Sequence, residues 1–320
     1  MMNFPAQLVV PTQTIPVRLD KFLVSQWPKT SRAYWQKNLE NRVRVDGKRA
    51  RKGQWLHGGE RLEFLKQERE GSKVSAPSLQ KIKVVLEDPS FLVVEKPPGL
   101  SVHPLLEEEE GTLVQEVARD YPEIASVGEA KREMGLAHRL DLETSGLVLI
   151  ARNEKAHAFL REEFRRRRVE KEYLALVAGK LKRVPTPEGW EKVDWPIAHH
   201  PKNRKKMIAL EKEAGKRIHP KKQTGRAAIT YYRVEKQFVD FTLLRVRILT
   251  GVRHQIRVHL AKHGLPLLGD SLYGGEKALS WKAPRIFLHA TRLVFRHPVS
   301  LRNIEVFSPL PDDLKDFLNR

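Results

Sequence analysis

The sequence predicts an α+β fold, and three observations lead to it. Many short apolar runs have the length and the β-branched content of strands, whereas few segments have helical spacing. The strand-like and helix-like segments do not alternate as they do in a parallel βαβ series. A small, polar, proline-broken stretch at residues 66–81 is typical of a linker. We therefore divide the chain into a front module with its linker, residues 1–75, and a main domain, residues 76–320.

The composition indicates a polyanionic partner. Among 320 residues, 59 are Lys or Arg and 39 are Asp or Glu, which gives a net charge of +20. Such an excess favours nucleic acid or an acidic membrane surface as the partner. No apolar run approaches the roughly 20 residues of a membrane span, and no secretory signal is recognisable at the N-terminus. Cysteine is absent, which excludes disulfides and cysteine-ligated metal sites. We expect a cytoplasmic protein without a cofactor.

The front module is predicted to hold two short helices and a small basic hairpin. Leu19, Phe22 and Leu23 share one helical face, and Thr30 or Ser31 can cap a second helix. Asp46-Gly47 is a strong hairpin turn signal. Charge runs are usually solvated surface, but few acids lie between residues 42 and 52, which favours contact with phosphate. The residues that we expect to bind RNA here are Arg32, Arg42, Arg44, Lys48 and Arg49.

The main domain begins with a predicted hairpin, residues 82–95, which is followed by a rigid turn at residues 96–104. Its centre is a compact polar block, residues 135–146, followed by the buried strand-like run 147–151. Asp141 therefore lies in a loop just before a rigid strand, a position that suits a catalytic group. Taken alone, Asp141 and Thr144 are more simply explained as turn caps.

Residues 154–167 have the spacing of an amphipathic helix, and strands are predicted at 171–177, 228–232 and 241–246. Between them, residues 180–222 are rich in Lys, Pro and His, and we expect a basic loop that touches phosphate. His199-His200, and later His254 and His259, invite a metal interpretation. We expect no metal, because adjacent histidines rarely share one ion and neither cysteine nor acidic ligands lie near.

Three motifs, in order, resemble those of the RluA family of RNA pseudouridine synthases. They are His138-Arg-Leu-Asp-x-x-Thr-Ser-Gly146, Tyr173 within Lys-x-Tyr, and Thr250-Gly-Val-Arg-His-Gln-Ile-Arg257. The resemblance implies a pseudouridine synthase fold with a mostly antiparallel mixed sheet and a cleft on one face. The order of elements in the front module resembles the RNA-binding module of ribosomal small-subunit protein S-four. Val252 stands where the family usually has arginine, and Arg253 follows one position later.

The resemblance implies that specific uridines in structured RNA are isomerised to pseudouridine, and we expect large-subunit (23S) ribosomal RNA to be the substrate. Asp141 aligns with the catalytic aspartate, Arg257 with the arginine that pairs with it, and Tyr173 with the active-site tyrosine. An arginine keeps a desolvated aspartate anionic and oriented. Whether Asp141 attacks the sugar or the base stays open. Arg139 is placed to fill the space of a flipped uridine.

Two alternatives remain at this point. The chain could be a pseudouridine synthase that acts on transfer RNA, or a non-catalytic RNA-binding factor of ribosome assembly, since charge and front module serve both. The joint presence of Asp141, Tyr173 and Arg257 argues against a non-catalytic factor. Neither paired carboxylates nor a metal cluster for hydrolytic chemistry is recognisable. We expect a monomer whose partner is RNA and not a membrane.

Overall fold

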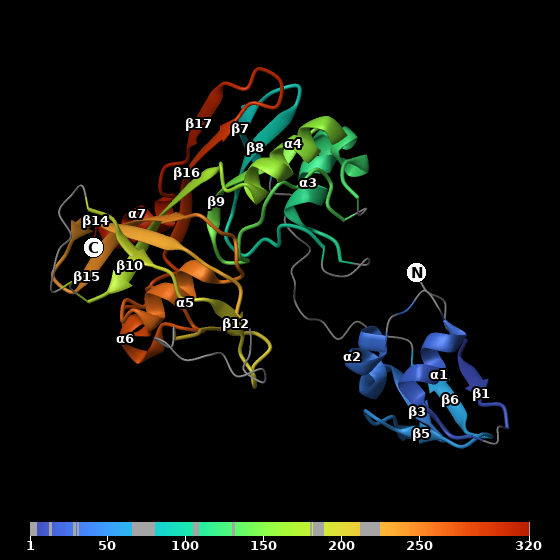
Figure 1. Cartoon of the computed structure of the whole chain (residues 1–320). Coiled ribbons are helices and arrows are strands. Elements are labelled where there is room, and N and C mark those ends of the chain that lie inside the picture. The colour runs from blue at the N-terminus through green and yellow to red at the C-terminus, as the bar shows by residue number, and fades with distance from the viewer. Residues whose placement is uncertain are drawn as a thin grey trace, which may run out of the picture. The chain divides into compact units, whose positions relative to one another are not determined.

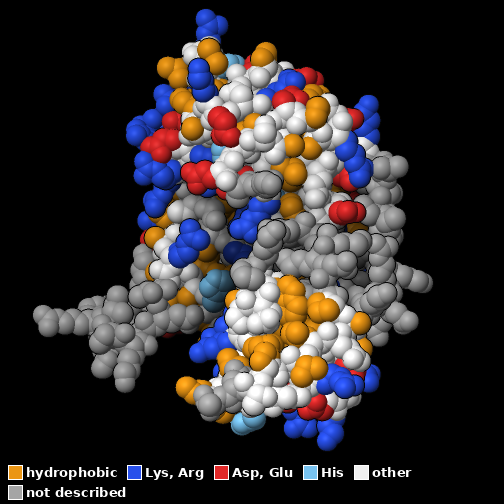
Figure 2. All heavy atoms as spheres, turned by 90° about the vertical axis from the view of Figure 1, so that its right-hand side faces the viewer, with side chains coloured by type: hydrophobic (Ala, Val, Ile, Leu, Met, Phe, Trp, Pro, Cys, Tyr) orange, Lys and Arg blue, Asp and Glu red, His pale blue; other side chains and the backbone are white. Residues whose placement is uncertain are grey.

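The computed structural model describes residues 5–12, 15–27, 30, 32–65, 81–104, 109–129, 132–179, 181, 189–211 and 225–319. The chain divides into two compact units, Met1–Ala76 and Pro77–Arg320. The predicted linker lies almost wholly outside the described residues. None of the helices in those residues combines the length and apolarity needed to cross a membrane. On the face drawn in Figure 2, Lys and Arg side chains outnumber Asp and Glu side chains, in keeping with the net charge.

The first unit packs two helices against a small sheet. Both predicted helices form, and their apolar faces meet around the buried side chains of Leu23, Trp35 and Leu39. The predicted hairpin forms as well, because Asp46 and Gly47 adopt the positive φ values, 50° and 73°, that its tight turn requires. The elements are β1 Gln7–Val9, β2 Val17–Arg18, α1 Leu19–Gln26, α2 Arg32–Arg42, β3 Val43–Val45, β4 Lys48–Arg49, β5 Trp55–Leu56 and β6 Arg61–Phe64.

The second unit is organised by a large sheet. Among the described residues, nine strands form it, in the order β11–β14–β15–β10–β16–β9–β8–β7, and β17 also pairs with β16. Its strands are β7 Lys83–Glu87, β8 Phe91–Lys96, β9 Ser145–Ala151, β10 Glu170–Ala178, β11 Glu191–Val193, β14 Thr230–Gln237, β15 Phe241–Ile248, β16 Leu288–Arg296 and β17 Asn303–Phe307. A separate hairpin joins β12 Ile197–His199 and β13 Met207–Ala209. The helices are α3 Leu113–Asp120, a 3₁₀ turn Pro122–Ser126, α4 Glu154–Arg165, α5 Gln255–Lys262, α6 Gly275–Leu279 and α7 Asp312–Leu318.

Helices cover both faces of this sheet, which explains why its central strands are apolar on both sides. On β9, Leu147 and Leu149 pack with α4, whereas Val148 and Ile150 pack with α3. The same alternation on β10 directs Tyr173 toward the cluster that contains α5, and Leu176 toward the cluster of α6 and α7. Figure 1 shows α3 and α4 next to β8 and β9, and α5 and α6 next to β10.

Strand β9 joins the two halves of the sheet. It pairs antiparallel with β8 and parallel with β16, and every other pairing of described strands in this sheet is antiparallel. The parallel pairing depends on Gly146, because a Cβ atom there would lie 2.2 Å from the Ala290 carbonyl oxygen. The mostly antiparallel mixed sheet and the α+β class are therefore confirmed. The loop that precedes β9 is held between β8 and β16, and it carries Asp141.

Candidate active site

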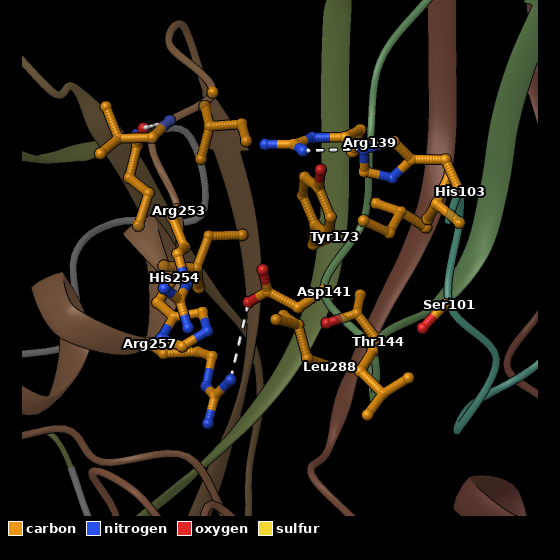
Figure 3. Close-up of a pocket in the computed structure, with 18 residues that line it drawn as sticks. Ser101, His103, Arg139, Asp141, Thr144, Tyr173, Arg253, His254, Arg257 and Leu288 are labelled. Carbon is orange, nitrogen blue, oxygen red and sulfur yellow. Dashed lines mark hydrogen bonds and ion pairs between the residues drawn. The ribbon is translucent and has the colours of Figure 1, made fainter. Parts of the chain in front are cut away.

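A cavity of about 490 Å³ opens in the second unit. Segments far apart in the sequence line it: residues 101–103 after β8, 139–142 before β9, Tyr173 on β10, 251–257 leading into α5, and Leu288 on β16. Figure 3 shows Asp141, Tyr173 and Arg257 around this space. The structure thus brings the three predicted catalytic residues together, although they are separated by up to 116 positions (257 − 141) in the chain.

The loop of Asp141 is fixed on both sides of the carboxylate. The Thr144 amide donates to the Asp141 carbonyl oxygen at 3.1 Å, and the Gly99 amide donates to the Leu142 carbonyl oxygen at 3.0 Å. From Ser145 onward the chain is fully buried in β9. The Asp141 side chain itself is 25% exposed. A partly open carboxylate on a rigid loop can reach a bound molecule without reorganisation.

Lys96, at the end of β8, stabilises the same loop through its buried ammonium group. Its ammonium group donates to the carbonyl oxygens of Pro97, Leu100 and Leu142 at 2.8, 2.9 and 2.8 Å. Because Lys96 is fully buried, contact with phosphate is excluded and its role is structural. Burial lowers the pKa of Lys96 to about 7. The three acceptors oppose this shift, because a neutral amine has only two hydrogens to donate.

His138 aligns the polar block with β9. Its Nε2 atom accepts a hydrogen bond from the Leu149 amide at 3.1 Å, and its ring stacks on Phe164 with 4.8 Å between centroids. Burial lowers the pKa of His138 to about 3, so the ring is neutral and can accept this bond. The His138 side chain therefore accepts a backbone hydrogen bond of β9 that a neighbouring strand would otherwise accept. This contact fixes the chain one residue before Arg139.

Tyr173 lies in the cavity wall and is only 5% exposed. Burial, with the charge of Asp141 as the second cause, raises the pKa of Tyr173 well above its usual value. Its hydroxyl group is therefore protonated at neutral pH. A protonated phenol can donate a hydrogen bond, and its ring offers a flat apolar surface, but it is a poor general base.

Arg257, on helix α5, faces the carboxylates of Asp141 and Asp270. Its Nη1 atom lies 3.7 Å from Asp141 Oδ2, whereas Nε and Nη2 each lie 2.8 Å from an oxygen of Asp270. Burial alone would lower the pKa of Arg257, but the hydrogen bonds and charge of Asp270, together with the charge of Asp141, raise it. The predicted pair of Arg257 with Asp141 is thus present as a longer ion pair, and the bidentate partner of Arg257 is Asp270.

Val252 and Arg253 take different directions in the third motif. Val252 is buried with Ile197, Met207 and Val258, so this position faces a small apolar cluster. Arg253 is exposed, and its guanidinium group lies 3.3 Å from the Lys205 carbonyl oxygen, in the loop of the β12–β13 hairpin. His259, further along α5, lies between Thr230 Oγ1 at 2.9 Å and the Trp195 carbonyl oxygen at 2.8 Å. In the residues described, no group of three metal-ligating side chains comes together.

Arg139 lies at the mouth of the cavity. The side chain is exposed, and its Nη1 atom lies 3.3 Å from His103 Nε2. Burial and then the charge of Arg139 lower the pKa of His103, so a neutral imidazole accepts this hydrogen bond. Figure 3 shows the two side chains meeting on the Tyr173 side of the cavity.

The five predicted RNA-binding residues of the first unit differ in their contacts within that unit. Arg32 forms an ion pair at 2.8 Å with Asp20, which is 1% exposed, and the Arg42 guanidinium donates to the Tyr34 hydroxyl. These two side chains therefore have internal partners. The exposed side chains on the β3–β4 hairpin are Arg44, Lys48 and Arg49, and of these Arg49 also donates to the Glu40 carbonyl oxygen at 2.6 Å.

The sequence analysis assigned no role to Asp270 or His103. The charge of Arg257 could have indicated Asp270. An arginine that enters a buried site needs a buried carboxylate as its partner. Asp270, in a turn that follows the arginine motif by 13 positions, was a candidate for that partner.

Comparisons with known proteins agree with the motifs. A family model described as RNA pseudouridylate synthase matches residues 90–262, a little more than half of the chain. A Xanthomonas campestris protein named ribosomal large subunit pseudouridine synthase D is 36% identical over 98% of this chain and 91% of its own length. An Aquifex aeolicus protein named uncharacterized RNA pseudouridine synthase is 38% identical over 88% of this chain and 86% of its own length.

A solved structure is similar in fold. Human RNA pseudouridylate synthase domain containing 1 aligns with a TM-score of 0.58 and 24% identity over 75% of this chain and 89% of that chain. The family match begins at residue 90, so the S-four-like nature of the front module stays a prediction. From the family match and the near full-length relatives it follows that the chain belongs to the RluA-type family of RNA pseudouridine synthases.

Proposed function

We propose that this protein isomerises specific uridines to pseudouridine in large-subunit (23S) ribosomal RNA, with Asp141, Tyr173 and Arg257 as the residues of the active site. One observation carries the assignment of the site. Asp141 is a partly exposed carboxylate that shares a cavity of about 490 Å³ with a protonated tyrosine and a buried arginine. The ribosomal substrate is supported by relatives named ribosomal large subunit pseudouridine synthase D.

The reaction breaks the bond between N1 of uracil and C1′ of ribose and forms a bond between C5 and C1′. The C5 proton is lost, and N1 gains a proton, so no atoms are added or removed. A carboxylate can form a temporary bond to C1′ or to the ring and is regenerated when C5 joins the sugar. Asp141 fits this task because the Arg257 guanidinium group orients it across 3.7 Å, a separation that leaves its oxygens available.

Tyr173 is assigned to holding the uracil ring. Its buried ring can stack on the base while the base is detached and turns, and its hydroxyl group can donate to a carbonyl oxygen of the base. Tyr173 is poorly suited to removing the C5 proton. The raised pKa means that the hydroxyl group must lose its own proton before it can accept another.

Arg139 and His103 are assigned to opening of the RNA. A uridine inside a helix must leave the stack before its glycosidic bond can be reached. Arg139 stands at the cavity mouth, where its planar guanidinium group can stack in the vacated space. Its contact with neutral His103 holds it at this place before RNA arrives.

The front module is assigned to binding of the RNA backbone. Arg44 and Arg49 lie directly opposite each other in the β3–β4 pairing, and both are exposed. Like charges at facing positions repel, and a phosphate between them removes the repulsion. Residues 1–75 would thus tether the RNA, and residues 76–320 would carry out the reaction in the cytoplasm.

The test measures pseudouridine in RNA from cells with and without this gene, by nuclease digestion and mass spectrometry, and repeats the reaction with purified protein. Large-subunit ribosomal RNA should lose pseudouridine at defined uridines, and purified protein should restore it there. Loss confined to transfer RNA would show that the substrate assignment is wrong. Folded protein that binds ribosomal RNA but forms no pseudouridine would favour an assembly factor.

A further inference from the structure

We propose that Asp270 is a positioning residue of the active site, which fixes Arg257 so that a single guanidinium nitrogen is directed at Asp141. The inference rests on the proposed roles of Asp141 and Arg257. It adds a residue of the turn between α5 and α6 to the site. The claim concerns geometry: Asp270 acts on the reaction through Arg257 and does not touch the substrate.

The first argument is that the Asp270 carboxylate is too deeply buried to reach a ligand. It is 1% exposed. Its Oδ1 atom accepts from the Leu272 amide at 2.9 Å, the Tyr273 amide at 3.0 Å and Arg257 Nη2 at 2.8 Å, and Oδ2 accepts from Arg257 Nε at 2.8 Å. Three of these four bonds fall on Oδ1, and the acceptor site that Oδ2 retains belongs to a side chain closed off from solvent. Asp270 can therefore act only through the groups that it holds.

The second argument is that contacts of the turn, independent of Arg257, fix the position of Asp270. Gly269 has a φ of +73°, and a Cβ atom there would lie 2.0 Å from the Arg285 carbonyl oxygen. The Gly274 amide closes the turn on the Asp270 carbonyl oxygen at 2.8 Å. The two amide bonds to Oδ1 then set the plane of the carboxylate. Because a bidentate contact requires the two planar groups to be aligned, the plane of the guanidinium follows from it.

The third argument concerns which nitrogens remain. A guanidinium group presents Nε and one Nη on one edge, and Asp270 takes that edge with two bonds of 2.8 Å. Of the donors that remain, Nη1 faces Asp141, 3.7 Å from its Oδ2 atom. The Tyr273 ring, 5.2 Å from the guanidinium carbon, covers one face of the group. Without Asp270, Arg257 would be free to take Asp141 in a bidentate pair, which would occupy both oxygens that the reaction needs.

The charges support the same view. Two carboxylates share one guanidinium group in this buried cluster, so one negative charge remains uncompensated by Arg257. That charge is left to Asp141, because Asp270 has both the closer contact and the two amide donors. Asp270 thus keeps Arg257 from neutralising the carboxylate that must react.

The experiment is a double-mutant cycle in the full-length protein, with single-turnover rates of pseudouridine formation on one RNA substrate. Asp270→Asn should lower kcat about 10- to 100-fold, the usual loss when a residue that orients an acting group is removed, with KM and RNA affinity changed less than about threefold. In an Arg257→Gln background, the same Asp270→Asn change should cost less than about threefold, because there is no guanidinium left to position.

A matched control is available in the same unit. Glu163, 2% exposed, holds Arg296 with two bonds of 2.8 Å, so it repeats the chemistry of Asp270 outside the residues that line the cavity. Glu163→Gln should lower thermal stability but leave kcat within about twofold of that of the unchanged protein. If Asp270→Asn does not fold, Asp270→Glu keeps the charge but shifts the carboxylate by one methylene group, and the same cycle is run with it.

Two results would overturn the inference. One is a kcat for the Asp270 variant within about twofold of that of the unchanged protein. The other is an equal loss in both Arg257 backgrounds, which would mean that Asp270 supports the fold only. Asp141→Asn is measured in the same experiment to test the proposed site. An active Asp141→Asn protein would overturn the site itself. An inactive Asp141→Asn protein, together with an Asp270 variant of unchanged activity, would overturn only the role of Asp270.

Discussion

Removal of three charges from the β3–β4 hairpin tests whether the front module contacts phosphate. Arg44, Lys48 and Arg49 are exposed there, and Arg49 also donates to Glu40 and Asn41; Arg32 and Arg42 lie outside the hairpin and pair with Asp20 and Tyr34. We therefore expect the triple change of these three exposed residues to Gln to remove three phosphate contacts and to leave the module folded. The sites of chemistry are elsewhere in the chain, so turnover at saturating RNA should survive.

The size of the effect follows from counterion release. Each contact contributes about 0.7–0.9 to the slope of log affinity against log salt, so three contacts reduce the slope by about 2.1–2.7. Between about 50 and 200 mM salt, a fourfold change, the unchanged protein should lose about 20- to 40-fold more affinity than the variant. Deletion of residues 1–75 should flatten the slope at least as much.

The assay is a salt titration of binding to a structured ribosomal RNA fragment, read by fluorescence anisotropy. The control variant removes three exposed cations of the second unit, Lys155, Arg302 and Lys315, and so makes the same change in net charge. Equal slopes for the two triple variants would refute local contact by the hairpin. A folded hairpin variant that is inactive at saturating RNA would instead make the module part of the active site.

Three further predictions concern stability and the site. Arg257→Lys should lower kcat about 100-fold, because one ammonium group cannot contact both Asp270 and Asp141; near-normal turnover would mean that the pair is misplaced. Lys96→Met should cost about 2–4 kcal/mol of unfolding free energy, measured by urea titration, because three carbonyl oxygens lose the donor that the buried ammonium group provides; an unchanged midpoint would contradict this. Burial alone would raise the pKa of Asp20, but hydrogen bonds from Arg32, Gln36 and Arg18 hold it well below its usual value. The isolated first unit should therefore keep its full stability above about pH 5 and lose it as the pH falls below about 4, and Asp20→Asn should flatten this dependence.

Local sequence signals predicted those parts of the fold that depend on neighbours in the chain. The β3–β4 turn follows from Asp46-Gly47, and β9 follows from the unbroken apolar run after Gly146. Helix α4 ends at Arg165, two residues before the predicted end, since Arg167 takes a positive φ of 58°. Such ends are decided by cap geometry, which composition does not reveal.

Long-range pairing was beyond those signals. Strand β16, Leu288–Arg296, lies between β9 and β10 in the sheet, and no strand was predicted there from the sequence. Its parallel register with β9 depends on a close approach at Gly146 that becomes visible only when both strands are placed. The motif Thr250–Arg257 runs into helix α5, Gln255–Lys262, which was not predicted from the sequence and which places Arg257 in the wall of the cavity.

The candidate site was predictable to the extent that motifs mark it. Asp141, Tyr173 and Arg257 line one cavity, as the resemblance implied. The bidentate partner of Arg257 was not predictable, because an aspartate in a turn has the same local signature whether it caps the turn or binds a distant arginine. Arg32 shows the reverse case: a charge expected on the RNA surface is paired with buried Asp20.

The central claim is that a single carboxylate carries the reaction, and Asp141→Asn tests it most directly. Purified Asp141→Asn protein and unchanged protein are compared for pseudouridine formation in ribosomal RNA and for RNA affinity. The side chain is partly exposed and Asn has nearly the same shape, so the variant should fold and bind RNA within about twofold of the unchanged protein. We predict no detectable pseudouridine, because an amide is neither a nucleophile nor an anion. Substantial turnover by a verified Asp141→Asn protein would contradict the account.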